Sequence, residues 1–244
     1  MLEQWIKWLT GFYSRWKIWV WLGISLAFAV IFLGIAEDVA HRELPVVYDR
    51  LFENWLVGAV TPALARIFMG ITQLGNGYVL AGVSLGLCLW WARKRLWRLS
   101  IGLVMSVAGA ALLNFCLKDL FERPRPDNPD AWAKAAGFSF PSGHAMISLV
   151  FFGFIAYALI HSFRNQKRAW ALALSLGIIP MAVGISRLVL GVHYPTDVLA
   201  GWAAGASWLA LCLALSIPFE FQKKEFLPDG PKSSADSKSS LAGP

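Results

Sequence analysis

Six stretches of the chain are apolar over lengths close to what is needed to cross a lipid bilayer. They span residues 18–36, 78–92, 99–117, 145–160, 169–189 and 198–217. A bilayer core is crossed by roughly 20 helical residues, so the shorter stretches 78–92 and 145–160 must include flanking residues. Backbone polar groups in lipid need partners within the segment, which a helix provides. With 57% hydrophobic and 15% charged residues, the sequence predicts an all-α, polytopic membrane protein built as a six-transmembrane-helix bundle.

The composition changes outside and between these stretches. In residues 1–17 large apolar side chains alternate with polar ones, which predicts an interfacial helix on the cytoplasmic side. Residues 18–217 form the membrane domain. The segment 57–74 is interrupted by a proline, an arginine and a glutamine and looks amphipathic, so we expect it at the membrane surface before the second span. Residues 218–244 are rich in Pro, Gly, Ser, Lys and Asp and predict a disordered cytoplasmic tail.

The positive charges are distributed as in a membrane protein. The formal net charge is +7, but most Lys and Arg residues precede the first span, lie in alternate turns or follow the last span. These clusters are Lys7, Arg15 and Lys17; Arg93, Lys94, Arg95 and Arg98; Arg164, Lys167 and Arg168; and Lys223 and Lys224. With six spans all four clusters lie on one side, as the positive-inside rule requires. The pattern predicts a membrane protein with both termini cytoplasmic and argues against a nucleic-acid partner.

Three polar strings interrupt the apolar pattern, all on the side opposite the basic clusters. They are Lys118 to Pro126, Pro141-Ser142-Gly143-His144, and Ser186-Arg187 followed by His193 and Asp197. Ionisable groups beside a bilayer are costly unless they have a function. Each group alone would be a helix cap, a loop residue or an interfacial cation. Their complementary chemistry on one side of one domain predicts a single site.

The first part of that chemistry suits an oxyanion. Ser142 and Gly143 precede a predicted helix, where free N–H groups and the helix dipole favour a phosphate. Arg125 and Arg187 can bind phosphate oxygens in a forked geometry, and Lys118 supplies a compact charge. Such charge neutralisation is most of what phosphoryl transfer requires.

The second part suits proton transfer and nucleophilic attack. Pro195 disfavours helix at the preceding residue, so His193 should lie on a turn and Asp197 in the first turn of the last span. A carboxylate bound to one imidazole nitrogen makes the other a better nucleophile. His144 is then available to protonate the departing oxygen. Arg123 alone is typical of a cation that reaches the membrane interface, so we expect an interfacial cation and leave contact with lipid headgroups open.

The three strings resemble the signature of the type 2 phosphatidic acid phosphatase superfamily, the lipid phosphate phosphatases. That signature is Lys, six residues, Arg-Pro; then Pro-Ser-Gly-His; then Ser-Arg, five residues, His, three residues, Asp. The resemblance implies His193 as nucleophile, Asp197 as its orienting carboxylate and His144 as general acid. It implies phosphate binding by Lys118, Arg125, Ser142, Gly143 and Arg187, no metal or other cofactor, and an outward-facing site. Among bacterial members the chain looks most like phosphatidylglycerophosphatase B-type enzymes, which implies a location in the bacterial cytoplasmic (inner) membrane.

The resemblance implies a metal-independent phosphatase acting on a membrane lipid. Candidate substrates are phosphatidylglycerophosphate, phosphatidic acid and undecaprenyl pyrophosphate. A lipid phosphotransferase using the same site stays open, as does a non-catalytic membrane scaffold or transporter, although no signature position is lost. A haloperoxidase with a similar site is disfavoured by the membrane composition. The sequence leaves the oligomeric state open.

Overall fold

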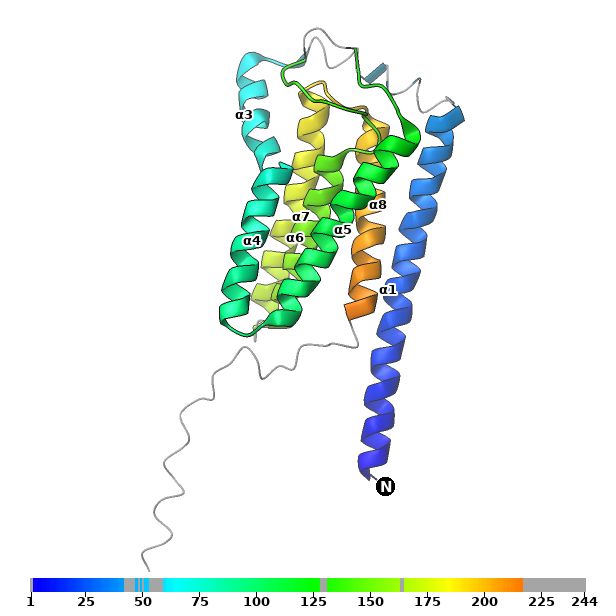
Figure 1. Cartoon of the computed structure of the whole chain (residues 1–244), viewed down its shortest axis with the longest axis vertical. Helices are drawn as coiled ribbons and strands as arrows, with labels where there is room; N and C mark the ends of the chain where they lie inside the picture. The colour runs from blue at the N-terminus through cyan, green and yellow to red at the C-terminus, as the bar shows by residue number, and fades with distance from the viewer. Residues whose placement is uncertain are drawn as a thin grey trace, which may run out of the picture.

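The computed structural model describes residues 2–41, 47, 49, 51–52, 59–127, 131–162 and 165–216, with side chains described from residue 16 to residue 215. The helices in this part of the chain are α1 (Leu2–His41), α3 (Pro62–Gln73), α4 (Gly77–Arg93), α5 (Trp97–Phe121), α6 (Gly143–Ser162), α7 (Gln166–Val189) and α8 (Pro195–Ser216). Six helical segments are long and apolar enough to cross a membrane, namely Trp16–His41, Pro62–Arg93, Trp97–Phe121, Gly143–Ser162, Gln166–Val189 and Pro195–Leu215. The predicted all-α, six-span bundle is confirmed (Figure 1).

The first helix extends well beyond its membrane-spanning part. α1 is continuous over 40 residues, so the segment expected to form an interfacial helix continues the first span without a break. Helix formation there agrees with the sequence, and its location at the interface stays a prediction. The tail predicted over residues 218–244 lies outside the described residues.

The segment expected at the membrane surface contains a helix that continues into the second span. α3 follows Thr61, whose side-chain oxygen accepts a hydrogen bond from the Leu64 N–H, and Pro62 occupies its first position. Asn76 then caps α4 by accepting from two N–H groups of its first turn. α3 packs against α7 and lies at the end of α4 (Figure 1). Together α3 and α4 form a candidate span of 32 residues.

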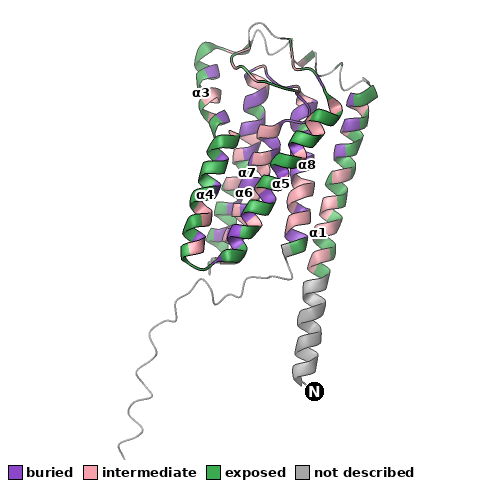
Figure 2. Ribbon diagram, in the orientation of Figure 1, coloured by how far each residue is buried: buried purple, intermediate pink, exposed green. Residues whose placement is uncertain are grey.

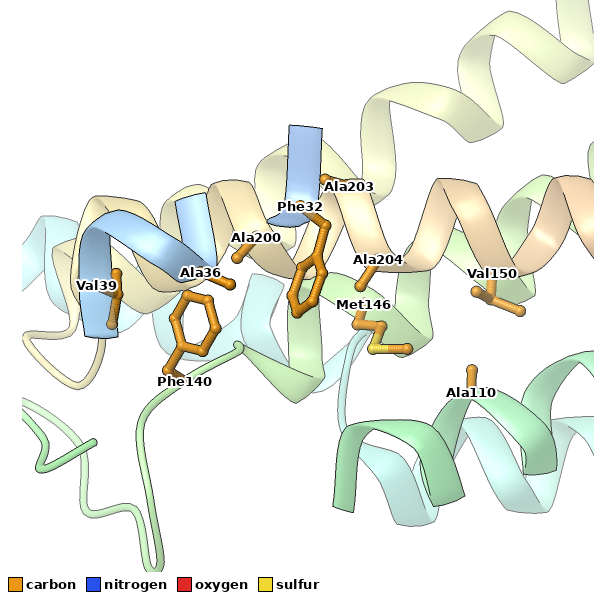
Figure 3. Close-up of a cluster of buried hydrophobic side chains, with 10 residues drawn as sticks. All are labelled: Phe32, Ala36, Val39, Ala110, Phe140, Met146, Val150, Ala200, Ala203 and Ala204. Carbon is orange, nitrogen blue, oxygen red and sulfur yellow. The ribbon is translucent and has the colours of Figure 1, made fainter. Parts of the chain in front are cut away.

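α6 lies at the centre of the bundle and contacts α4, α5, α7 and α8, while α1 packs along α8. Buried residues face inward and exposed apolar residues face outward, as expected for helices surrounded by lipid (Figure 2). One core cluster joins Phe32 and Ala36 of α1 to Met146 of α6 and to small residues of α8, Ala200 among them (Figure 3). Small side chains let helix backbones approach closely, which favours association in a membrane.

The start of α6 and the start of α8 are in especially close contact. A Cβ atom built on Gly201 would lie 2.7 Å from the carbonyl oxygen of Ser142, and one on Gly205 would lie 2.9 Å from that of Met146. Only glycine allows this approach. α5 ends, and α6 and α8 begin, at the same end of the bundle, here called the loop end (Figure 1). The residues at these helix ends are therefore brought together.

Candidate active site

A cavity of about 440 Å³ opens at the loop end among the three predicted polar strings. Six of the predicted site residues line it: Lys118, Arg125, Gly143, His144, Arg187 and His193. Ser142 and Asp197 are fully buried beneath its wall. The remaining wall comes from Met69, Thr72 and Gln73 of α3, from Asn76 before α4, and from residues 132–136. The sequence did not indicate this contribution of α3.

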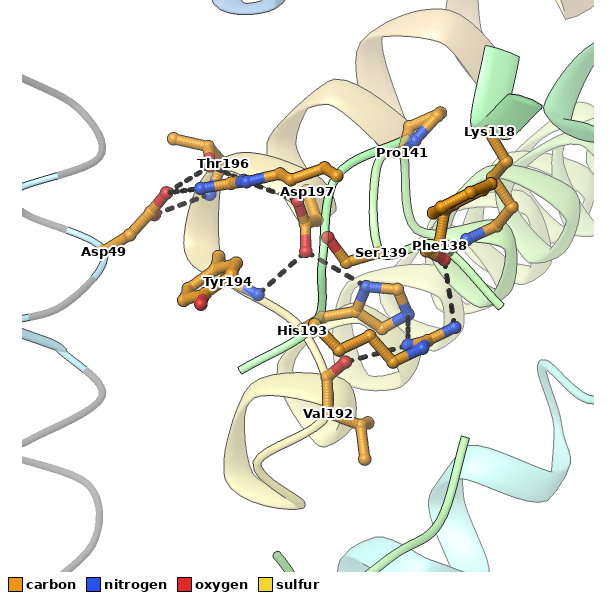
Figure 4. A network of polar contacts seen from close by, with 12 residues as sticks. Asp49, Lys118, Phe138, Ser139, Pro141, Val192, His193, Tyr194, Thr196 and Asp197 are labelled. Atoms are coloured by element: carbon orange, nitrogen blue, oxygen red, sulfur yellow. Dashed lines mark hydrogen bonds and ion pairs between the residues drawn. The ribbon is translucent and has the colours of Figure 1, made fainter. Parts of the chain in front are cut away.

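The imidazole of His193 is held by the carboxylate of Asp197. His193 lies on the turn before α8 and Asp197 in its first turn, as Pro195 predicted. Asp197 Oδ2 lies 3.2 Å from His193 Nδ1 and also accepts a hydrogen bond of 3.0 Å from the Tyr194 N–H (Figure 4). Because a carboxylate only accepts, the proton of the neutral ring belongs on Nδ1, and the lone pair is on Nε2.

The electrostatics of this buried position favour the neutral ring. His193 is 5% exposed. Burial lowers the pKa of His193 to about 4, and the hydrogen bond and charge of Asp197 oppose this shift without overcoming it. The imidazole is therefore uncharged at neutral pH, which is the state that can attack an electrophile.

Arg125 uses all of its N–H groups within the protein. Its acceptors are the carbonyl oxygens of Gly137 at 2.9 Å, Val192 at 2.9 Å, Ala136 at 3.0 Å and Phe138 at 3.2 Å, and Nε2 of His193 at 3.1 Å. Burial lowers the pKa of Arg125, with Asp197 opposing, yet a guanidinium stays charged. Lys118 Nζ also donates to the carbonyl of Phe138. Arg125 thus ties residues 136–138 to the turn that carries His193, and Lys118 ties Phe138 to α5.

Two buried polar atoms of the predicted phosphate-binding set lack a protein partner in the described part of the chain, Ser142 Oγ and Arg187 Nε. Other atoms of these two residues form hydrogen bonds within the protein. The Ser142 N–H donates to the backbone oxygen of Asp197 at 2.9 Å, and Arg187 Nη1 donates to Thr72 Oγ1 at 2.8 Å. An unpaired buried donor costs about 1–3 kcal/mol, so these atoms are suited to a polar ligand.

Gly143 starts α6 in close contact with the Asn114 side chain. A Cβ atom there would lie 2.8 Å from Oδ1 of Asn114, whose Nδ2 donates to the carbonyl oxygen of Pro141 at 3.3 Å. His144 follows on the cavity wall. Ser186 belongs to the third string but does not line the cavity, because its hydroxyl donates back to the carbonyl of Val183 within α7.

Arg123 is not an interfacial cation, and that expectation is wrong. It is 9% exposed, and its Nη1 donates to Asp197 Oδ1 at 2.6 Å and to Thr196 Oγ1 at 2.7 Å. Its Nη2 donates to Asp49 Oδ2 at 2.8 Å, and its guanidinium lies 4.3 Å from the centre of the Tyr194 ring. No motif or spacing in the sequence indicated a role for Asp49. Arg123, like Arg125, is followed by a proline. This repeat was the one feature of the sequence that indicated a role for Arg123 at the site.

The part of the chain that the structure describes contains no group of three His, Cys, Asp or Glu side chains arranged to hold a metal ion. Three buried or half-buried cations line the cavity, Lys118, Arg125 and Arg187, and the exposed Lys134 lies at its wall. Such an arrangement is suited to phosphoryl transfer, because it combines fixed cations with a neutral, oriented imidazole.

Comparisons with known proteins match most of the chain. The profile of the PAP2 superfamily matches residues 97–219. Phosphatidylglycerophosphatase B of Bacillus subtilis is 37% identical over 183 residues, covering 72% of this chain and 86% of the relative. Undecaprenyl-diphosphatase of Sulfolobus acidocaldarius is 32% identical over 162 residues, covering 64% of this chain and 71% of the relative. The crystal structure of a transmembrane PAP2 type phosphatidylglycerolphosphate phosphatase from Bacillus subtilis superposes with a TM-score of 0.73 at 29% identity, covering 82% of this chain and 98% of that chain.

Proposed function

The chain belongs to the PAP2 superfamily, and we propose that it removes phosphate from a membrane lipid through a phosphohistidine formed on His193 at the extracytoplasmic face. The observation that carries this proposal is the convergence of the three predicted cations, two histidines and a helix start on one cavity. The hydrolase class is shared by the named relatives, which are phosphatases or diphosphatases. The intermediate, the residue roles and the sidedness are the proposed parts.

In the proposed first step, Nε2 of His193 attacks the phosphorus atom and the bond between phosphorus and the lipid oxygen breaks. Lys118, Arg125 and Arg187 neutralise the phosphate oxygens, together with the hydroxyl of Ser142 and the backbone at Gly143. His144 gives its proton to the departing oxygen. In the second step water attacks the phosphohistidine, His144 takes a proton from that water, and inorganic phosphate leaves with His193 neutral again.

The proposed substrate class follows from the surroundings of the cavity. Its volume of about 440 Å³ is within the range of small-molecule sites and leaves room for more than one phosphate group. The surrounding helices expose large apolar side chains, alongside which lipid chains can remain in the bilayer. The names of the relatives favour phosphatidylglycerophosphate or an undecaprenyl diphosphate, and phosphatidic acid is the third candidate.

The test is phosphate release by the purified protein from each of the three lipids in detergent. We expect release from at least one lipid, with acid-quenched samples containing labelled phosphoprotein. His193→Ala should abolish both signals. His161→Ala is the matched control, because His161 lies in the last turn of α6 and its ring contacts the carbonyl of Tyr157, away from the cavity. Transfer of the phosphate to a second lipid without free phosphate would instead identify a phosphotransferase.

Support for the outward-facing site comes from the basic clusters. The turn between α4 and α5, which carries Lys94 and Arg95, lies at the end of the bundle opposite the loop end (Figure 1). With the cysteines at 88, 116 and 212 replaced by alanine, Trp132→Cys should react with an impermeant thiol reagent in intact cells. The control Lys94→Cys should react only after permeabilisation. The reverse pattern would invert the proposed topology.

A further inference from the structure

A buried chain of charges extends from Asp197 away from the cavity. Arg123 bridges two carboxylates, since its Nη1 lies 2.6 Å from Asp197 Oδ1 and its Nη2 lies 2.8 Å from Asp49 Oδ2 (Figure 4). Asp49 is 1% exposed and Asp197 is fully buried. Neither Asp49 nor Arg123 lines the cavity. Asp49 and Arg123 therefore do not contact a substrate in the cavity, but they are connected to His193 through Asp197.

Asp49 also holds the start of α8. Its Oδ1 accepts a hydrogen bond of 3.1 Å from the N–H of Thr196, and its Oδ2 accepts from the Thr196 hydroxyl. The first N–H groups of a helix have no partner within the helix, and a carboxylate there is stabilising. Asp49 thus acts as a cap supplied from the segment between α1 and α3. It fixes the helix turn that carries Asp197.

We infer that Asp49 and Arg123 are positioning residues for the proposed phosphoryl transfer, which set both the orientation of Asp197 and the share of its negative charge available to His193. This inference rests on the proposed function. The two oxygens of Asp197 are divided, one toward Arg123 and the other toward His193. The strength of the electrostatic interaction between Arg123 and Asp197 depends on the second partner of Arg123, which is Asp49.

The charge balance explains why two carboxylates are needed. While the imidazole is neutral, Asp49 and Arg123 cancel each other and Asp197 carries one uncompensated charge. When Nε2 bonds to phosphorus the ring becomes cationic, and the charge of Asp197 then stabilises it. If Asp49 were neutral, Arg123 would already compensate Asp197 and less stabilisation would remain for the cationic ring. Replacing an outer partner that orients a metal-bound histidine changes activity by roughly 10–100-fold, and we expect the same order of magnitude here.

The charged and titratable groups around His193 come from every neighbouring element. They are Asp197 of α8, Arg187 of α7, His144 of α6, Lys118 of α5, and Arg125 and Lys134 of the segment between α5 and α6. All except Asp197 are basic, so Asp197 is the group in this set that favours a protonated ring. A change in the network behind Asp197 should therefore appear in the pH dependence of catalysis.

The test compares Asp49→Asn with the wild type in detergent. We expect kcat to fall roughly 10–100-fold with KM changed less than about twofold, because the phosphate-binding groups are untouched. The acid limb of kcat/KM should move to lower pH, since Asp197 would favour the protonated ring less. Arg123→Gln should lose more, because two buried carboxylates then lack their cation. The double variant Asp49→Asn/Arg123→Gln should recover roughly tenfold relative to Arg123→Gln.

The control for a purely structural effect is Ser25→Ala. Ser25 and Ser207 exchange hydrogen bonds of 2.9 Å between α1 and α8, so this change weakens another contact of α8 without touching the charges. It should lower thermal stability and leave the pH profile unchanged. If Asp49→Asn also lost only stability, or kept wild-type kcat and pH profile while the wild type forms phosphoprotein, the inference would be overturned. A wild type without phosphoprotein would instead contradict the proposed function.

Discussion

A methyl group at the contact between α6 and α8 should disturb the site without disrupting the fold. In Gly201→Ala the new Cβ would lie 2.7 Å from the Ser142 carbonyl oxygen and 3.2 Å from Cβ of Ala145. Reaching an ordinary separation of about 3.4 Å requires the two helix starts to move apart by several tenths of an ångström. One of them carries His144 and the other follows His193, so the proposed acid and nucleophile should separate.

The size of the effect follows from that displacement. A misplacement of 1 Å in an active site can cost about 10²-fold, so we expect kcat to fall on the order of tenfold. The hydrogen bond of 2.9 Å from the Ser142 N–H to the Asp197 oxygen crosses the same contact and should weaken. The helix itself should not suffer, because alanine is favoured over glycine by about 1 kcal/mol within a helix.

The measurement is phosphate release combined with thermal unfolding in detergent. Gly82→Ala is the matched control, because a Cβ there would meet no atom within 4 Å. It should keep wild-type activity and equal or higher stability. The reasoning would be refuted by wild-type turnover in Gly201→Ala, or by an equal loss of activity in Gly82→Ala.

Three further predictions concern the chemistry. His144→Ala should lose roughly 10²–10⁴-fold on a lipid substrate and much less on an aryl phosphate, whose leaving group scarcely needs a proton; an equal loss on both would exclude the proposed acid role. The depressed pKa of His193, about 4, keeps the ring neutral in mild acid, so the enzyme's own acid limb of kcat/KM should lie near pH 4. Because Asp197 raises the pKa of His193, Asp197→Asn should move the acid limb of kcat/KM to still lower pH. The measurement is the ratio of kcat/KM between variant and wild type at each pH, in which substrate ionisation cancels. Activity should survive EDTA, since Lys118, Arg125 and Arg187 supply the charge; complete loss restored only by magnesium would contradict this.

The spans were predictable because hydrophobic length is a local property of the chain. The predicted stretch 145–160 lies within α6, Gly143–Ser162, and the predicted stretch 169–189 lies within α7, Gln166–Val189. Helix packing was less predictable. Gly82 and Gly86 have the same spacing as Gly201 and Gly205, yet only the second pair lies against another backbone. A spacing identifies one face of a helix and leaves its neighbour unspecified.

The cavity residues of the three polar strings were predictable because each string is short and carries its functional groups at nearby positions. The network behind them was not, because its members are distant in sequence. Arg123 is 74 residues from its partner Asp197, and Asp49 is 147 residues from Thr196. A lone aspartate or arginine beside an apolar helix is usually interfacial. Only the folded arrangement shows that these two meet.

The arrangement of Arg125 adds a condition that sequence spacing could not reveal. Its five donors are already used, one of them on Nε2 of His193. On the proposed mechanism, a phosphate approaching that nitrogen must take over N–H groups that now bind carbonyl oxygens of residues 136–138. Hydrogen bonds to a charged acceptor are roughly twice as strong as neutral ones, so this exchange is favourable. The same exchange removes the Arg125 N–H from the lone pair of His193 Nε2. Phosphate binding therefore also frees the nucleophile for attack.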